Sequence, residues 1–94
     1  MDLDKTVLWV KMTYKDSSCR ILKATRSLEA IEFYCEKLED RDVYDFENKV
    51  LKPGYLFDVN NCKIVEVGKD VKLEVSKSKP DYDREVDKYA SSFV

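Results

Sequence analysis

One amphipathic stretch, residues 27–38, separates two parts of the chain that are rich in β-branched and aromatic residues. Its apolar positions recur at spacings of three and four, which places them along one side of a helix. They are Leu28, Ile31, Tyr34, Cys35 and Leu38. Ser27 stands where an N-cap belongs, because its hydroxyl can accept a hydrogen bond from the first helical turn. The pattern predicts one main helix on which the β-rich parts pack.

The part before this stretch predicts a β-hairpin, with strands at 6–14 and 19–25 joined by a polar loop at 16–18. A three-residue loop there would place Met12 opposite Leu22. This register gathers the apolar side chains on one face and leaves the lysines on the other, whereas a slip of one residue would mix the two sets. The expected buried face consists of Leu8, Val10, Met12, Leu22 and Ala24.

The part after it predicts a three-stranded meander over residues 55–77. Asn60-Asn61 is suited to a two-residue type I′ turn, and Gly68-Lys69 is suited to a type II′ turn. The two turns would place Ile64 opposite Phe57 on one side and opposite Leu73 on the other. The same register points Cys62 toward the core.

Together these patterns predict an α+β fold, in which a single antiparallel sheet of about five strands in ββαβββ order packs on one main helix. At 94 residues, positions 1–94 are expected to form a single domain. Residues 81–94 can form a short C-terminal helix. Residues 76–94 can equally be a flexible tail that orders only on a partner.

Composition excludes several kinds of catalysis. The chain has no histidine, which removes Ser-His-Asp and Cys-His mechanisms and the usual zinc sites. Its three cysteines, Cys19, Cys35 and Cys62, form no CxxC pair and are expected to be reduced. Two glycines are too few for a phosphate-binding loop. We therefore expect a protein that is not an enzyme and has no catalytic residues, no metal and no cofactor.

The distribution of apolar residues indicates a cytoplasmic protein. No apolar run approaches the roughly 20 residues that cross a bilayer. The N-terminus is acidic and lacks the basic and long apolar regions of a signal peptide.

Charge is segregated along the chain although the net charge is only −2. Residues 5–26 carry a net charge of +5, and residues 27–50 carry −5. A molecule with charge of both signs favours contacts with proteins over contacts with nucleic acid, which require a large basic excess.

The acidic segment after the helix is the leading candidate for binding a protein partner. It alternates carboxylates with aromatic rings at Glu39, Asp40, Asp42, Tyr44, Asp45, Phe46 and Glu47. Such a segment could imitate the charge of a nucleic acid and occupy a basic groove. The same carboxylates are also what a solvated surface contains.

Two further surfaces are alternatives. The outer face of the expected sheet carries Trp9, Leu56, Val65 and Val67, which would be covered by a partner, by a second copy in a homodimer, or by the C-terminal segment. The polar face of the hairpin carries Lys11, Lys15 and Lys23, which could contact single-stranded nucleic acid or simply keep the strands soluble.

The expected function is that of a non-enzymatic protein-interaction module. In character the chain is similar to small accessory and inhibitor proteins encoded by viruses and mobile elements, which act on larger host complexes. The alternative is a small nucleic-acid-binding protein that uses the basic face of the hairpin.

Overall fold

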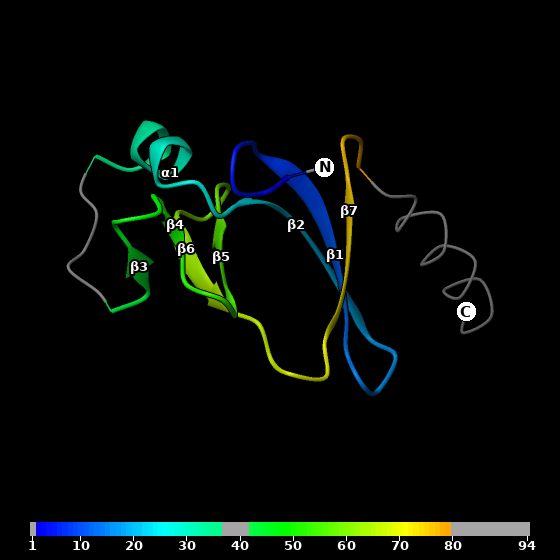
Figure 1. Cartoon of the computed structure of the whole chain (residues 1–94). Helices are drawn as coiled ribbons and strands as arrows, with labels where there is room; N and C mark the ends of the chain where they lie inside the picture. The colour runs from blue at the N-terminus through cyan, green and yellow to red at the C-terminus, as the bar shows by residue number, and fades with distance from the viewer. Residues whose placement is uncertain (1, 37–41, 80–94) are drawn as a thin grey trace.

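The computed structural model describes residues 2–36 and 42–79, which form one helix and seven strands (Figure 1). The elements are β1 (Leu8–Thr13), β2 (Cys19–Thr25), α1 (Leu28–Tyr34), β3 (Tyr44–Asp45), β4 (Val50–Leu51), β5 (Tyr55–Asp58), β6 (Lys63–Glu66) and β7 (Lys72–Ser76). Five strands form an antiparallel sheet in the order β6-β5-β2-β1-β7, and β3 pairs with β4. The predicted α+β class is confirmed. The expected C-terminal helix at 81–94 lies outside the described residues, as does all of the expected tail at 76–94 except residues 76–79.

The β1–β2 hairpin has the predicted faces but not the predicted register. Met12 lies opposite Arg20 rather than Leu22, a shift of two residues that leaves every side chain on its expected face. The loop again has three residues, but they are 15–17. Tyr14 donates its N–H to the carbonyl of Ser18 at 2.8 Å, and Ser17 adopts a left-handed conformation at φ 72°. The loop therefore begins one residue earlier than the sequence pattern indicates.

The β5–β6 pair has the predicted register, with Phe57 opposite Ile64. Its turn is longer than predicted, because pairing stops at Asp58 and Lys63 and leaves a four-residue loop at 59–62. Cys62 lies in this loop at φ 51° and is exposed, so the prediction that it points into the core is wrong.

The predicted pairing of β6 with β7 is also wrong. Strand β7 pairs instead with β1, at the opposite edge of the sheet, with Leu73 opposite Met12. Gly68 does not take the positive φ that a type II′ turn requires at its first position, so the chain does not reverse there. Val71 donates its N–H to the Gly68 carbonyl at 3.4 Å, and the chain passes on to β7.

Helix α1 begins where predicted. Ser27 caps it by accepting a hydrogen bond from the Ala30 N–H at 3.3 Å. It ends at Tyr34 rather than at Leu38, which lies outside the described residues. Its buried side chains are Leu28 and Ile31. No helix among the described residues has the length and apolarity to cross a membrane.

Two separate apolar clusters form the interior. The helix-side core contains Leu28, Ile31, Tyr44, Leu51, Phe57 and Val59. The hairpin-side core contains Val10, Met12, Leu22, Ala24 and Leu56. Leu56 and Phe57 are neighbours on β5 and therefore point to opposite faces of the sheet. Strand β5 thus contributes to both clusters.

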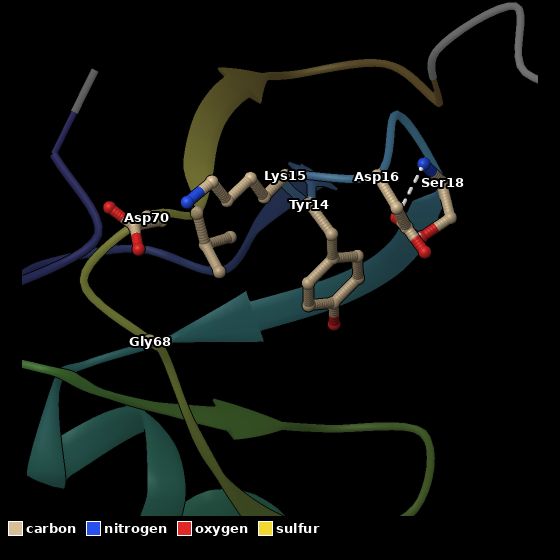
Figure 2. A pocket seen from close by; sticks show the side chains of 7 residues that line it. Tyr14, Lys15, Asp16, Ser18, Gly68 and Asp70 are labelled. Atoms are coloured by element: carbon tan, nitrogen blue, oxygen red, sulfur yellow. Dashed lines mark hydrogen bonds between the residues drawn. The ribbon is translucent and has the colours of Figure 1, made fainter.

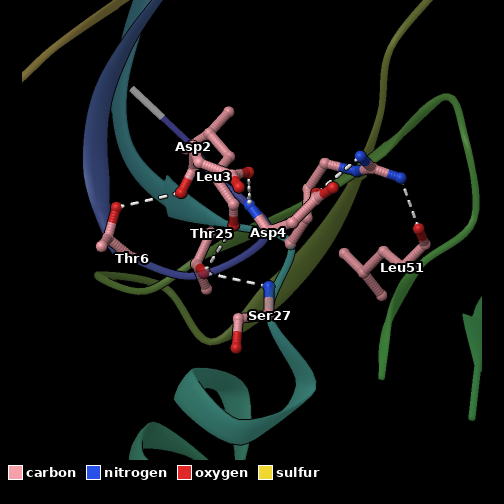
Figure 3. Close-up of polar contacts among 8 residues, drawn as sticks. Asp2, Leu3, Asp4, Thr6, Thr25, Ser27 and Leu51 are labelled. Carbon is pink, nitrogen blue, oxygen red and sulfur yellow. Dashed lines mark hydrogen bonds and ion pairs between the residues drawn. The ribbon is translucent and has the colours of Figure 1, made fainter. Parts of the chain in front are cut away.

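Arg26 connects the N-terminal arm, residues 2–6, with β2 and β4, through polar contacts that involve Leu3, Asp4 and Leu51 of Figure 3. Its backbone N–H donates to the Leu3 carbonyl at 2.8 Å, and its carbonyl accepts from the Leu51 N–H at 2.8 Å. Its guanidinium lies 2.7 Å from an Asp4 carboxylate oxygen and also donates to the Leu51 carbonyl. Thr25 adds a hydroxyl donor to the Leu3 carbonyl at 3.2 Å. These bonds provide partners for backbone polar groups of Leu3, Arg26 and Leu51.

Candidate protein-binding surfaces

The acidic segment is divided between exposed and buried positions. Asp42 and Glu47 are exposed, whereas Tyr44 is buried in the helix-side core. In this structure Tyr44 therefore anchors the segment and does not present its ring to a partner. Glu39 and Asp40 lie outside the described residues.

The turn between β3 and β4 displays an aromatic ring. Phe46 is 57% exposed, and its ring centroid lies 5.6 Å from that of Tyr44, which supports it from below. Asp45 closes the turn by accepting hydrogen bonds from the N–H and the side-chain amide of Asn48, at 3.1 and 2.8 Å. The side-chain bond from Asn48, with help from the backbone bond, lowers the pKa of Asp45 below its ordinary value. The carboxylate is therefore a turn cap and holds Phe46 in place.

Helix α1 presents a second exposed aromatic ring, which the sequence analysis missed. Phe33 is 84% exposed, and its ring packs edge to face on Tyr34 with centroids 5.3 Å apart. A signal was present, since Phe33 lies far around the helix from Leu28 and Ile31 on a 100° wheel. The apolar spacing of the helix identifies the residues that share its buried face, and Phe33 lies outside that face.

Glutamates surround this ring. Glu29, Glu32 and Glu36 are exposed, and residues 27–36 contain no basic side chain. The start of α1 is fixed beside β4 by a hydrogen bond of 3.0 Å from the Leu28 N–H to the carbonyl of Lys49, the residue before that strand. Helix α1, β3 and β4 all contribute side chains to the helix-side core, so both aromatic sites lie on elements packed over the same cluster. We name their exposed side chains the acidic aromatic surface: Glu29, Glu32, Phe33, Glu36, Phe46 and Glu47.

The basic residues of the hairpin are only partly brought together. Lys11 and Lys23 lie on the outer face of β1–β2 and are half-buried, and Trp9 lies directly opposite Lys23. Lys11 lies opposite Glu74 of β7, which offsets its charge. Lys79 places its ammonium 5.9 Å from the centroid of the Trp9 ring. Trp9 is half-buried and does not form an open stacking platform.

Lys15 lies at the hairpin turn and lines an open pocket of about 570 Å³ with Tyr14, Asp16, Ser18, Gly68, Asp70 and Val71. Figure 2 shows its side chain extending from the turn toward Asp70. The Ser18 hydroxyl and N–H donate to Asp16, and the hydroxyl bond is the larger cause of a lowered pKa for that carboxyl. Asp16 thus shapes the loop and does not supply an acid to the pocket.

The residues of the remaining predicted interface do not form one exposed face. Leu56 is 2% exposed and belongs to the hairpin-side core, and Val65 and Val67 are half-buried against that core. Trp9 lies on the opposite face of the sheet from Leu56, because Val10 and not Trp9 belongs to that cluster.

The described residues contain no cluster of three potential metal ligands. The buried carboxylate of Asp58 has structural partners, since it accepts from the Asn60 N–H at 3.1 Å and the Asn61 amide at 2.9 Å and lies 3.6 Å from Arg20.

Comparison of the chain with protein-family models, curated proteins and solved structures found no match.

Proposed function

We propose that this protein is a non-enzymatic protein-interaction module that docks its acidic aromatic surface onto a basic, apolar-lined face of a partner protein. The exposure of Phe33 carries the proposal. A phenylalanine that is 84% exposed gains little from folding, and large exposed aromatics are the side chains that anchor protein interfaces. The surrounding Glu29, Glu32 and Glu36 select a basic partner.

This surface would act as a small inhibitor acts, by occupying a basic groove of a larger complex. Carboxylates around the anchors would replace the phosphates of a nucleic acid that such a groove otherwise holds. We expect the encounter in the cytoplasm, because the three cysteines form no CxxC pair and are expected to be reduced, as is usual in that compartment.

A binding experiment with a defined probe tests the proposal. The probe is a fluorescent amphipathic peptide of alternating lysine-rich and leucine-rich turns, titrated with the full chain and followed by anisotropy. Phe33→Ala should weaken binding at least tenfold, since removing an anchor typically costs about 2 kcal/mol. The affinity of the wild-type chain should also fall steeply with added salt.

The matched control is Tyr55→Phe, which changes an aromatic side chain packed against the helix-side core and leaves the acidic aromatic surface intact. It should bind the peptide like the wild-type chain. Equal binding by the wild-type and Phe33→Ala chains would reject the proposed anchor. A wild-type chain that fails to bind the peptide at low salt would reject the surface as a whole.

The position of Lys11 and Lys23 on one face of the hairpin supports a second candidate function, nucleic-acid binding by that face. Its test is a single-stranded oligonucleotide titrated with the wild-type chain and with a triple charge reversal of Lys11, Lys15 and Lys23 to Glu. This candidate predicts binding that the reversal abolishes. The proposed protein-binding function predicts that peptide binding survives the same reversal.

A further inference from the structure

Strand β7 has one edge that pairs with no other strand of the described residues. It forms one border of the five-stranded sheet and, within residues 2–36 and 42–79, pairs only with β1 (Figure 1). Its residues Lys72, Leu73 and Glu74 are exposed, and Leu73 is 39% exposed. The strand contains no proline, glycine or bulge that would block a further strand. A regular edge of this kind can pair with a further strand.

The hairpin register shows which backbone groups point outward. Tyr14 donates its N–H to Ser18 of the paired strand, so Tyr14 and, by alternation, Met12 direct their backbone groups toward β2. The residues between them direct theirs toward β7. Thr13 lies opposite Lys72, so Lys72 bonds inward and Leu73, the next residue, directs its N–H and carbonyl to the free edge.

A second copy of the same strand can complete these bonds about a two-fold axis. Only odd-numbered residues of β7 direct their backbone groups outward, so odd-numbered residues of the two copies must lie opposite each other. The two-fold axis therefore passes beside one residue of β7 and not between two residues. If that residue is Leu73, the outward bonds are made between the two Leu73 residues. Lys72 then faces Glu74 of the second copy, and the symmetry repeats that charge pair.

A two-fold axis beside any other residue of β7 is less favourable because of the charges that it brings together or leaves unpaired. An axis beside Glu74 places two carboxylates opposite each other, and an axis beside Lys72 does the same with two ammonium groups. An axis beside Val75 places Glu74 opposite Ser76 and makes no charge pair. Within one chain the Lys72 ammonium already lies 3.5 Å from a Glu74 carboxylate oxygen, and both side chains are more than half exposed. Both are therefore available for exchange across the axis.

We propose that this chain forms a homodimer in which β7 pairs antiparallel with β7 of a second copy, about a two-fold axis beside Leu73. The two five-stranded sheets become one continuous sheet. Each Leu73 side chain covers the other, and Val71 lies opposite Val75 of the second copy on the same apolar face. This pairing uses a different surface from the proposed protein-binding function and stands independently of it.

The mass of the full chain in solution tests the dimer. Light scattering over a concentration series should approach twice the 11.0 kDa of the single chain. Leu73→Lys should return the mass to that of one chain, because it places two ammonium groups opposite each other at the axis. Leu73→Thr is the matched control, since it removes the same apolar side chain without adding charge, and it should still pair. Fluorescence of Trp9 reports whether each variant is folded.

Cross-linking tests the register without relying on that variant. Opposed residues of a hydrogen-bonded antiparallel pair have Cα atoms about 5.5 Å apart, which a disulfide can span. Leu73→Cys should therefore form a covalent dimer under mild oxidation. Lys72→Cys should not, because its symmetry mate lies diagonally at about 7–8 Å. The wild-type chain, with its three native cysteines, controls for other cross-links.

Three results would overturn the proposal. The first is a single-chain mass at every concentration of the wild-type protein. The second is a dimer that persists in folded Leu73→Lys, which would place the contact on another surface. The third is a dimer in which Lys72→Cys cross-links more readily than Leu73→Cys, which would exclude the axis beside Leu73.

Discussion

The hairpin-side core and the helix-side core are built in different ways. The first takes most of its residues from β1 and β2, long strands in which every second side chain points inward. The second takes them from a seven-residue helix, two strands of two residues each, and β5. Long alternating strands bring their apolar residues together by periodicity alone. Short segments need specific backbone bonds to hold them in place.

Those bonds are visible on the helix side. The Leu51 N–H donates to the Arg26 carbonyl, and the Lys52 N–H donates to the Val43 carbonyl, each at 2.8 Å. Between β2 and β5 the paired residues are Ala24 with Asp58 and Thr25 with Phe57, and the Val59 N–H donates to the Lys23 carbonyl at 3.0 Å. Because this junction is short, we expect the helix side to open without unfolding the hairpin side.

Paired truncations should show the largest effects. Leu51 is 0% exposed in the helix-side core, and Met12 is 1% exposed in the hairpin-side core. Leu51→Ala and Met12→Ala should each lower the free energy of unfolding by about 2–5 kcal/mol. Leu51→Ala should also reduce the hydrogen-exchange protection of amides in α1 and β4 before those in β1. Equal loss of protection in both halves would show that they open as one unit.

Removing the Arg26 side chain should have an intermediate effect. Arg26→Met keeps most of the apolar stem but removes the donors to Asp4 and to the Leu51 carbonyl. Leaving that carbonyl without its side-chain partner should cost about 1–3 kcal/mol in urea-induced unfolding. Asp4→Asn removes only the ion pair to Arg26. Because the Asp4 side chain is 41% exposed, this loss should cost less. If Asp4→Asn costs as much as Arg26→Met, the bond to Leu51 contributes little.

The smallest expected effect concerns pH at the β3–β4 turn. The hydrogen bonds from Asn48 lower the folded-state pKa of Asp45 below its ordinary value of 3.8. A lowered pKa means that the ionised form stabilises the fold above that value, and that this stabilisation is lost as the pH falls through the folded-state pKa. Asp45→Asn should therefore have a slightly lower melting temperature than the wild-type chain at pH 7.

The difference in melting temperature should narrow as the pH falls below 3.8 and should close below the lowered folded-state pKa of Asp45, where the wild-type chain also loses its ionised carboxylate. Asp42→Asn is the matched control, because it removes an exposed carboxylate just before the same short hairpin and leaves the Asn48 bonds intact. A gap between the wild-type and Asp45→Asn chains that widens toward low pH would contradict the assigned role of the turn.

Sequence reasoning identified what depends on local pattern. The N-cap at Ser27, the buried face of β1 and the register of Phe57 with Ile64 were all confirmed. The hairpin register was wrong by two residues, because such a shift leaves the faces unchanged and the apolar pattern cannot detect it. The conformation of Ser17 decides the register, and serine carries no strong signal for a positive φ.

The partner of β7 could not be predicted from the same pattern. Leu73 and Val75 alternate in a way that suits β6 and β1 equally, and the distinction depends on long-range packing. The acidic segment was predicted as a binding surface from its composition, but burial of Tyr44 and exposure of Phe33 are properties of the assembled helix-side core. Composition shows which side chains could bind a partner, and packing decides which of them are left exposed.

The adjacent residues Leu56 and Phe57 belong to different clusters, and this has a consequence for how such a chain can evolve. A replacement elsewhere in one cluster can be compensated by neighbours in that cluster, without altering the other. Replacement of Leu56 or Phe57 alters β5, the strand that contributes side chains to both clusters. Natural variants should therefore diverge independently in each half of the molecule, while the dipeptide at 56–57 tolerates the fewest changes.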